Sequence, residues 1–216
     1  MPGVPARPKI YHITHLRNLP QIVAASRIWS DAKRVELGLD CEIVGMSEIK
    51  RRRLEDLEVH CHLGTTVGQY VPFYFCPRSI MLYILHRGNH PDLNYREGQQ
   101  PIVHLQADLH DTVQLADQHG VRWTFSNTNA GARYASFYAS LDRLAEVNWS
   151  AVKATDFRNP LIKDGKQAEF LVFESFPWSL VERIGVASQA VLQRIQQVLA
   201  AGARRPPANV EPRWYF

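Results

Sequence analysis

One carboxylate stands at the mouth of a strongly apolar stretch of the chain. Glu169 directly precedes Phe170–Phe173 (Phe-Leu-Val-Phe), which has the composition of a buried strand. A charged group beside such a strand costs free energy unless a partner or a function holds it there. A solvated Glu at a strand edge is the alternative, and the surrounding sequence favours the functional interpretation.

A second group of polar side chains lies near the start of the chain. His12 and Thr14 are two positions apart within Tyr11–His15. If this segment is a strand, that spacing places both side chains on the same face. Such a pair can hydrogen-bond to its neighbours or contact a ligand, and the residues alone leave both possibilities open.

Positive charge is concentrated in short blocks. The formal net charge is +4 and the sequence pI is about 9.0, which suits a polyanionic partner without requiring one. Lys50–Arg53 is the main block, and it belongs to an expected helix that begins near Ser47. This block is either a solvated helix face or a group of guanidinium ions that bind phosphate.

Length and composition favour one packed domain. The chain has 216 residues, of which 45% are hydrophobic. Three cysteines at irregular spacing argue against a disulfide framework, and His60–His62 (His-Cys-His) is a poor tetrahedral set, so no metal is predicted.

No apolar run reaches the roughly 18–20 residues of a membrane span, and the start lacks a signal-peptide core; a cytoplasmic location is predicted.

Short strands and helices alternate without βαβ regularity, which predicts an α+β domain. No Gly-x-Gly-x-x-Gly or P-loop sequence is present. The predicted division is a flexible arm over 1–8, one domain over 9–203 and a tail over 204–216. Within the domain we expect a helix over 133–144 and an irregular segment over 149–163, and strands at the positions that must place the site: 9–14, 70–75 and 167–173.

Four segments together resemble the DarT family of bacterial DNA ADP-ribosyltransferase toxins, over residues from about 7 to about 186. The segments are Ile10–His15, Ile49–Leu54, Tyr70–Ser79 and Gln167–Val172. The resemblance implies a single-domain ADP-ribosyltransferase-like fold. Its centre would be a split β-sheet or sandwich with flanking short helices.

The resemblance also implies the reaction and the partners. NAD would be the substrate, nicotinamide would leave, and ADP-ribose would be attached to a base of single-stranded DNA, which we expect to be thymine. The expected partner protein is an antitoxin of the DarG type, whose macrodomain removes the mark. A monomer is predicted, because no exposed apolar stripe stands out.

The same resemblance assigns roles to individual residues. Glu169 would stabilise the positive charge that develops on ribose during glycosidic cleavage, and Arg52 would organise phosphate and base beside it. Arg is a poor base at its usual pKa of roughly 12.5 or higher, so a role in proton removal would need help from its surroundings. Residues expected to hold NAD are His12, Thr14, Tyr74, Met81 and Arg53.

Contact with DNA requires positive charge and aromatic faces for stacking. The expected DNA-binding residues are Arg158, Lys163, Asn129 and Trp149, and the loop 156–166 is where the target would be recognised. Two alternatives stay open: the same fold acting on guanine, RNA or protein, and a non-catalytic nucleic-acid-binding module. NAD consumption separates the module from the enzymes, and the acceptor separates the enzymes from each other.

Overall fold

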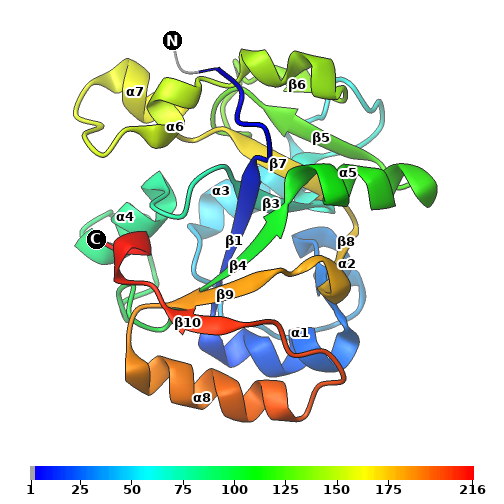
Figure 1. The fold of residues 1–216 in the computed structure, drawn as a ribbon. Coiled ribbons are helices and arrows are strands. Elements are labelled where there is room, and N and C mark those ends of the chain that lie inside the picture. Colours follow the sequence, from blue (N-terminus) through cyan, green and yellow to red (C-terminus); the bar gives the residue numbers. More distant parts are fainter. Residues whose placement is uncertain (1–2) are drawn as a thin grey trace.

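An eight-stranded sheet runs through the centre of the computed structural model, which describes residues 3–216 (Figure 1). The strands are β1 (Lys9–His15), β3 (Tyr70–Tyr74), β4 (Ile102–Asp108), β5 (Trp123–Ser126), β6 (Phe137–Tyr138), β7 (Glu169–Phe173), β9 (Arg183–Val186) and β10 (Ala208–Val210). Their order is β10-β9-β4-β1-β3-β7-β5-β6, and every pair is antiparallel except β10–β9. A separate two-stranded sheet joins β2 (Arg27–Trp29) to β8 (Ser175–Pro177).

Eight α-helices surround the sheet within the described residues. They are α1 (Leu19–Ala25), α2 (Asp31–Glu36), α3 (Ser47–Glu55), α4 (Ile80–Arg87), α5 (Leu109–Gln118), α6 (Trp149–Lys153), α7 (Pro160–Gly165) and α8 (Gln189–Ala200). Five short 3₁₀ helices complete the set: η1 (Leu16–Asn18), η2 (Val67–Gln69), η3 (Leu141–Glu146), η4 (Trp178–Leu180) and η5 (Pro212–Trp214). Helix α8 runs beneath β9 and β10, while α6 and α7 lie together at the opposite end of the molecule (Figure 1). The predicted α+β class is confirmed.

Alternation along β7 divides its side chains between the two faces of the sheet. Phe170 and Val172 join the main core, and Leu171 joins a smaller cluster with Tyr70. Burying each such apolar side chain contributes on the order of 1.5–3 kcal/mol. The strand that carries Glu169 is therefore held firmly on both faces.

Two local predictions were wrong. In place of the helix expected over 133–144, the chain forms β6 and η3, because Phe137 and Tyr138 pair with the edge strand β5. The segment 149–163, expected to be irregular, contains α6 and most of α7. Asn148 and Asn159 cap these helices through their side chains, and Pro160 occupies the first turn of α7.

The last residues of the chain pack against the sheet. Strand β10 pairs in parallel with β9, and the buried Tyr215 hydroxyl donates to the Ile102 carbonyl at 2.7 Å. The predicted tail 204–216 thus adds a strand and a buried aromatic side chain to the same domain. Of the arm predicted over 1–8, residues 1 and 2 lie outside the described residues, whereas Arg7 pairs with Asp108 at 2.9 Å.

None of the helices within residues 3–216 has both the length and the apolar character needed to cross a membrane.

Close packing of the C-terminal segment makes Gly185 sensitive to substitution. A Cβ at this position would lie 2.2 Å from the Trp214 ring. Gly185→Ala should lower the free energy of unfolding by about 1–3 kcal/mol, because the ring must move away. Thermal unfolding measures this, with Gly3→Ala as the control since nothing lies within 4 Å of its Cβ. Equal melting temperatures for the two variants would contradict the packing described.

Acid should destabilise the protein through His104. This residue is fully buried beneath Tyr215 and donates from Nε2 to the Pro77 carbonyl at 2.9 Å. Burial lowers its pKa to about 4. Between pH 6.5 and 4 the unfolded chain takes up a proton at His104 that the folded protein does not. The free energy of unfolding therefore decreases as the pH is lowered, by about 3 kcal/mol at pH 4.

The comparison of urea unfolding at pH 7 and pH 4 tests this. His104→Gln should remove the corresponding part of the pH dependence, and His119→Gln, at an exposed position, should leave it in place. An unchanged pH dependence in His104→Gln would show that other groups account for the loss.

Candidate active site

A cleft opens where the end of β3 meets the start of β7. The register pairs Tyr74 with Glu169 directly across the two strands, so their side chains are neighbours on one face. Strand β1 contributes His12 and Thr14 to the same cleft, and helix α3 contributes Arg53. Pairing within one sheet thus brings together residues more than 150 positions apart in the sequence.

Glu169 is the most enclosed charged group of the cleft, with 1% of its side chain exposed. Its Oε1 accepts from Arg53 Nη1 at 3.1 Å and its Oε2 accepts from Arg53 Nη2 at 2.9 Å. The backbone N–H of Ala130 donates to Oε1 at 3.0 Å. This bidentate ion pair explains how a carboxylate is retained beside an apolar strand.

The arginine that enters the cleft is Arg53. Residues that line the cleft within 3–216 include Arg53 and Lys50 but not Arg52, so the sequence prediction is corrected by one position. One residue along a helix changes the direction of a side chain by about 100°. The phase of α3 therefore decides which arginine meets Glu169, and no spacing in the sequence fixes that phase.

The electrostatics of the pair keep Arg53 protonated. Burial alone lowers the pKa of Arg53, but the adjacent Glu169 carboxylate outweighs it and the net shift is upward. A guanidinium in this state cannot accept a proton, so Arg53 can orient and neutralise an anion but cannot act as a base.

His12 and Thr14 lie on the cleft side of β1, as their spacing predicts. His12 Nδ1 donates to the Pro72 carbonyl at 2.9 Å, which leaves Nε2 as an acceptor. Burial lowers the pKa of His12, despite the Pro72 hydrogen bond, so the ring is neutral near pH 7. The Thr14 hydroxyl accepts from the Asn18 amide at 3.1 Å.

Tyr74 and Met81 also line the cleft. Burial and the nearby Glu169 raise the pKa of Tyr74, so its hydroxyl stays protonated and can donate a hydrogen bond. Tyr74 thus offers an aromatic face and a donor beside the carboxylate. All five residues predicted to hold NAD are gathered in one cleft.

Sequence reasoning missed two contributions to this cleft. Asp31 lines it and binds Lys50 Nζ at 3.0 Å; burial raises the pKa of Asp31, but the neighbouring cations lower it further. The Ser30 cap at the start of α2 was the available signal for a residue fixed here. The Ala130 N–H had no signal at all, because any residue type supplies a backbone donor.

The predicted DNA-binding residues lie in three different environments: one lines the cleft, two are exposed near α7, and one is buried. Asn129 lines the cleft and donates to Gln167 Oε1 at 3.2 Å, while Arg158 and Lys163 are exposed on the segment around α7. The prediction for Trp149 is wrong: the residue is 5% exposed, its Nε1 donates to the Leu144 carbonyl, and its ring packs on Phe75. A buried indole with its donor satisfied cannot stack on a DNA base.

A cluster of three carboxylates lies outside the cleft. Asp108, Asp111 and Glu182 have oxygens within 4.8 Å of one another. Arg7 binds both aspartates, and Lys9 binds Asp108 and Glu182 at 2.8–3.0 Å. Each of the three carboxylates therefore has a cation beside it, Arg7 or Lys9.

Loss of Arg53 should destabilise the fold, because the buried Glu169 charge would have no counterion. Arg53→Met should reduce the free energy of unfolding by about 3–5 kcal/mol. Arg52→Met should change it by no more than about 0.5 kcal/mol. The double variant Arg53→Met with Glu169→Gln should recover much of the loss, and urea unfolding measures all three. Equal effects at positions 52 and 53 would contradict the ion pair.

Comparison with known proteins identifies the family. A family model described as "ssDNA thymidine ADP-ribosyltransferase, DarT" matches residues 11–216. The "DNA ADP-ribosyl transferase" of Thermus sp. (strain 2.9) is 33% identical over 210 residues, which covers 96% of this chain and 95% of that protein.

Two solved structures have the same fold. "Thermus sp. 2.9 DarT in complex with ADP-ribosylated ssDNA" superimposes with a TM-score of 0.89 at 32% identity, covering 100% of this chain and 99% of that one. The same protein in complex with carba-NAD+ gives 0.83 at 31% identity, covering 99% and 100%. The resemblance and the enzyme class expected from the sequence are confirmed, and the chain belongs to the DarT family of single-stranded DNA thymidine ADP-ribosyltransferases.

Proposed function

We propose that the Glu169 cleft performs the reaction of its family, in which ADP-ribose moves from NAD to thymine in single-stranded DNA and nicotinamide is released. One observation carries this proposal: the buried pair of Glu169 and Arg53 faces a cleft with neutral hydrogen-bonding side chains, His12, Thr14 and Tyr74, on its walls. The Thermus sp. 2.9 protein, whose complexes hold carba-NAD+ and ADP-ribosylated single-stranded DNA, supports it.

Glu169 stabilises the sugar as its bond to nicotinamide breaks. Positive charge then develops at ribose C1′, and a fixed carboxylate nearby lowers the energy of that state. A carboxylate has about four acceptor positions, of which Arg53 and Ala130 use three. The remaining position is free to accept from a ribose hydroxyl, a bond that strengthens as the sugar becomes positive.

Arg53 orients the carboxylate and the incoming base. Thymine has one ring N–H, at N3, so attack by N3 on C1′ forms an N–C bond, releases neutral nicotinamide and frees one proton. Because Arg53 stays protonated, that proton goes to a carboxylate or to water and not to the guanidinium. Arg53 therefore acts by position and charge.

Four other residues hold NAD. His12 Nε2 and the Thr14 hydroxyl offer acceptors for sugar hydroxyls, since Nδ1 of His12 is already committed to Pro72. Tyr74 and Met81 supply an aromatic face and an apolar contact for the nicotinamide ring.

The DNA strand approaches from the side of α7. Asn129 is placed within the cleft to read the target base through its amide, while Arg158 and Lys163 offer positive charge outside it. Choice of thymine over guanine, RNA or protein then depends on the loop 156–166. We also propose that the protein acts as a monomeric toxin in the cytoplasm and is reversed by a macrodomain antitoxin of the DarG type, as the family resemblance implies.

Mass spectrometry of short single-stranded oligonucleotides incubated with NAD tests the reaction. Thymine-containing strands should gain one ADP-ribose. Glu169→Gln should reduce the rate by at least about 10²–10³-fold, because the stabilising charge is lost, whereas Arg52→Met should retain activity. Glutamine has nearly the same shape as glutamate, so loss of folding is separable by thermal unfolding.

Each other outcome has its own meaning. Nicotinamide release that depends on Glu169, with no gain of mass on any DNA, would move the acceptor to RNA or protein. If no NAD is consumed at all, the proposal of an enzyme is overturned and the non-catalytic nucleic-acid-binding module remains. Equal rates for the parent protein and Glu169→Gln would remove the carboxylate from the mechanism.

A further inference from the structure

A second cavity of about 350 Å³ is lined by a different set of residues from the Glu169 cleft. Lys9 and Tyr11 of β1 line it, whereas His12, Ile13 and Thr14 line the cleft, so successive parts of one strand serve the two sites. Its other walls come from the end of β3, the segment from α6 to α7 and the C-terminus beside α4 (Figure 1). The volume is within the range of small-molecule sites, roughly 300–1,000 Å³.

A buried ammonium group without a counterion lines this cavity. Lys166 is 3% exposed, and its Nζ donates to the Val152 carbonyl at 2.8 Å and to Cys76 Sγ at 3.4 Å. Within residues 3–216, no carboxylate lies within ion-pair distance of it. Burying an unpaired charge is costly, and one N–H of the three remains for another acceptor. The arrangement favours an anionic ligand.

Arg78 provides a second unused donor. Its Nε is buried without a hydrogen-bond partner among the described residues, and its guanidinium lies 4.3 Å from the centre of the Phe216 ring. Lys153 and Arg213 line the cavity from exposed positions. Arg7 and Lys9 already pair with carboxylates, so the available positive charge belongs to these four residues. None of the described lining residues is acidic.

The walls of the cavity also carry aromatic rings. Phe157 and Phe216 meet edge to face, with ring centres 5.9 Å apart, and both line the cavity. Aromatic faces next to arginine and lysine are the combination that binds a nucleotide, because the base stacks while the phosphate takes the charge.

We infer that this cavity is a second nucleotide-binding site, which takes a phosphate-bearing nucleotide from the part of the DNA strand that flanks the target. The inference rests on the proposed function. Tyr74 and Glu169 line the cleft, the residues directly after Tyr74 line the cavity, and Lys166 is only three residues from Glu169, at most about 11 Å along the backbone. A single DNA strand that passes this part of the sheet can therefore contact both sites.

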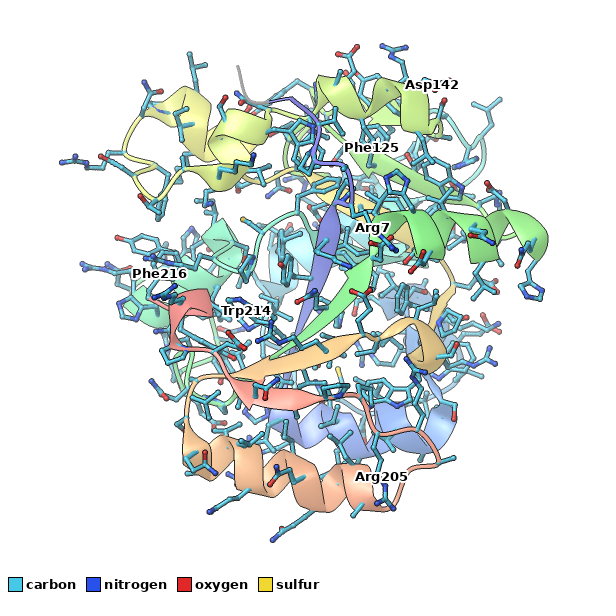
Figure 2. The ribbon with its side chains drawn as sticks, in the orientation of Figure 1. Arg7, Phe125, Asp142, Arg205, Trp214 and Phe216 are labelled. Carbon is cyan, nitrogen blue, oxygen red and sulfur yellow. The ribbon has the colours of Figure 1, made fainter. Side chains whose placement is uncertain are left out.

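Charge changes at the cavity test the assignment by fluorescence anisotropy with a labelled single-stranded oligonucleotide. Lys166→Met and Arg213→Glu should each weaken binding about tenfold. The dependence of log affinity on log salt should fall by about 0.7 for each phosphate that the variant no longer binds. Arg205→Glu is the matched control: Arg205 is exposed near the end of α8, far from Phe216 (Figure 2), and should bind like the parent.

The outcomes separate this site from the reaction. Unchanged affinity in Lys166→Met and Arg213→Glu, or an equal loss in Arg205→Glu, would overturn the site even if DNA is modified. Cavity-dependent binding without transfer of ADP-ribose would support the site while the proposed function fails. Free thymidine monophosphate is the second probe: if Lys166→Met loses its binding yet binds the strand normally, a free nucleotide and not the flanking strand is the ligand, and the flanking-strand assignment is overturned. Thermal unfolding checks that each variant is folded.

Discussion

A buried carboxylate that must be neutralised is the constraint on which this structure depends. Glu169 begins a strand that is apolar on both faces, and its charge is tolerable only because Arg53 and the Ala130 N–H bind it. Satisfying that one group fixes the phase of α3, the conformation of the turn before Ala130, and the position of both relative to β7. The same three hydrogen bonds leave the carboxylate fixed but not saturated, which is the condition for catalysis by charge.

The environment fixes the protonation state of the residues around Glu169. Burial keeps His12 neutral and Tyr74 protonated, and the ion pair keeps Arg53 charged. At the centre of the cleft one enclosed anion, Glu169, is held by one cation, Arg53, and the Asp31–Lys50 pair lines the same cleft. Such a site is organised to stabilise a cationic sugar and is poor at removing protons, which fits a reaction whose difficulty lies in breaking a glycosidic bond. In the second cavity the balance is reversed, since the buried Lys166 binds a carbonyl and a thiol but no carboxylate.

The sequence predicted the class of the fold and the position of Glu169, because a charge beside an apolar run is a strong local anomaly. Spacing of two along β1 also predicted correctly that His12 and Thr14 share a face. The sequence favoured Arg52 over Arg53 as the arginine of the cleft, whereas the structure places Arg53 there. The direction of each side chain depends on where α3 begins and on what the helix packs against, and the sequence does not reveal either. The prediction that Trp149 binds DNA has a related weakness. An aromatic residue near basic residues gives the same sequence pattern in a core as on a surface, and Trp149 is buried. The Ala130 donor and the pairing of β10 with β9 arise from backbone geometry and tertiary contacts, which residue types do not encode locally.

The central claim is that the enclosed carboxylate stabilises a positively charged ribose. The secondary kinetic isotope effect on nicotinamide release, with tritium in place of hydrogen at C1′ of the nicotinamide ribose, tests it most directly. If the bond to nicotinamide is largely broken before the acceptor bonds, C1′ becomes planar in the transition state and the labelled substrate reacts clearly more slowly. Equal rates for labelled and unlabelled NAD, with bond cleavage rate-limiting, would show that no cationic sugar develops and would contradict the role given to Glu169.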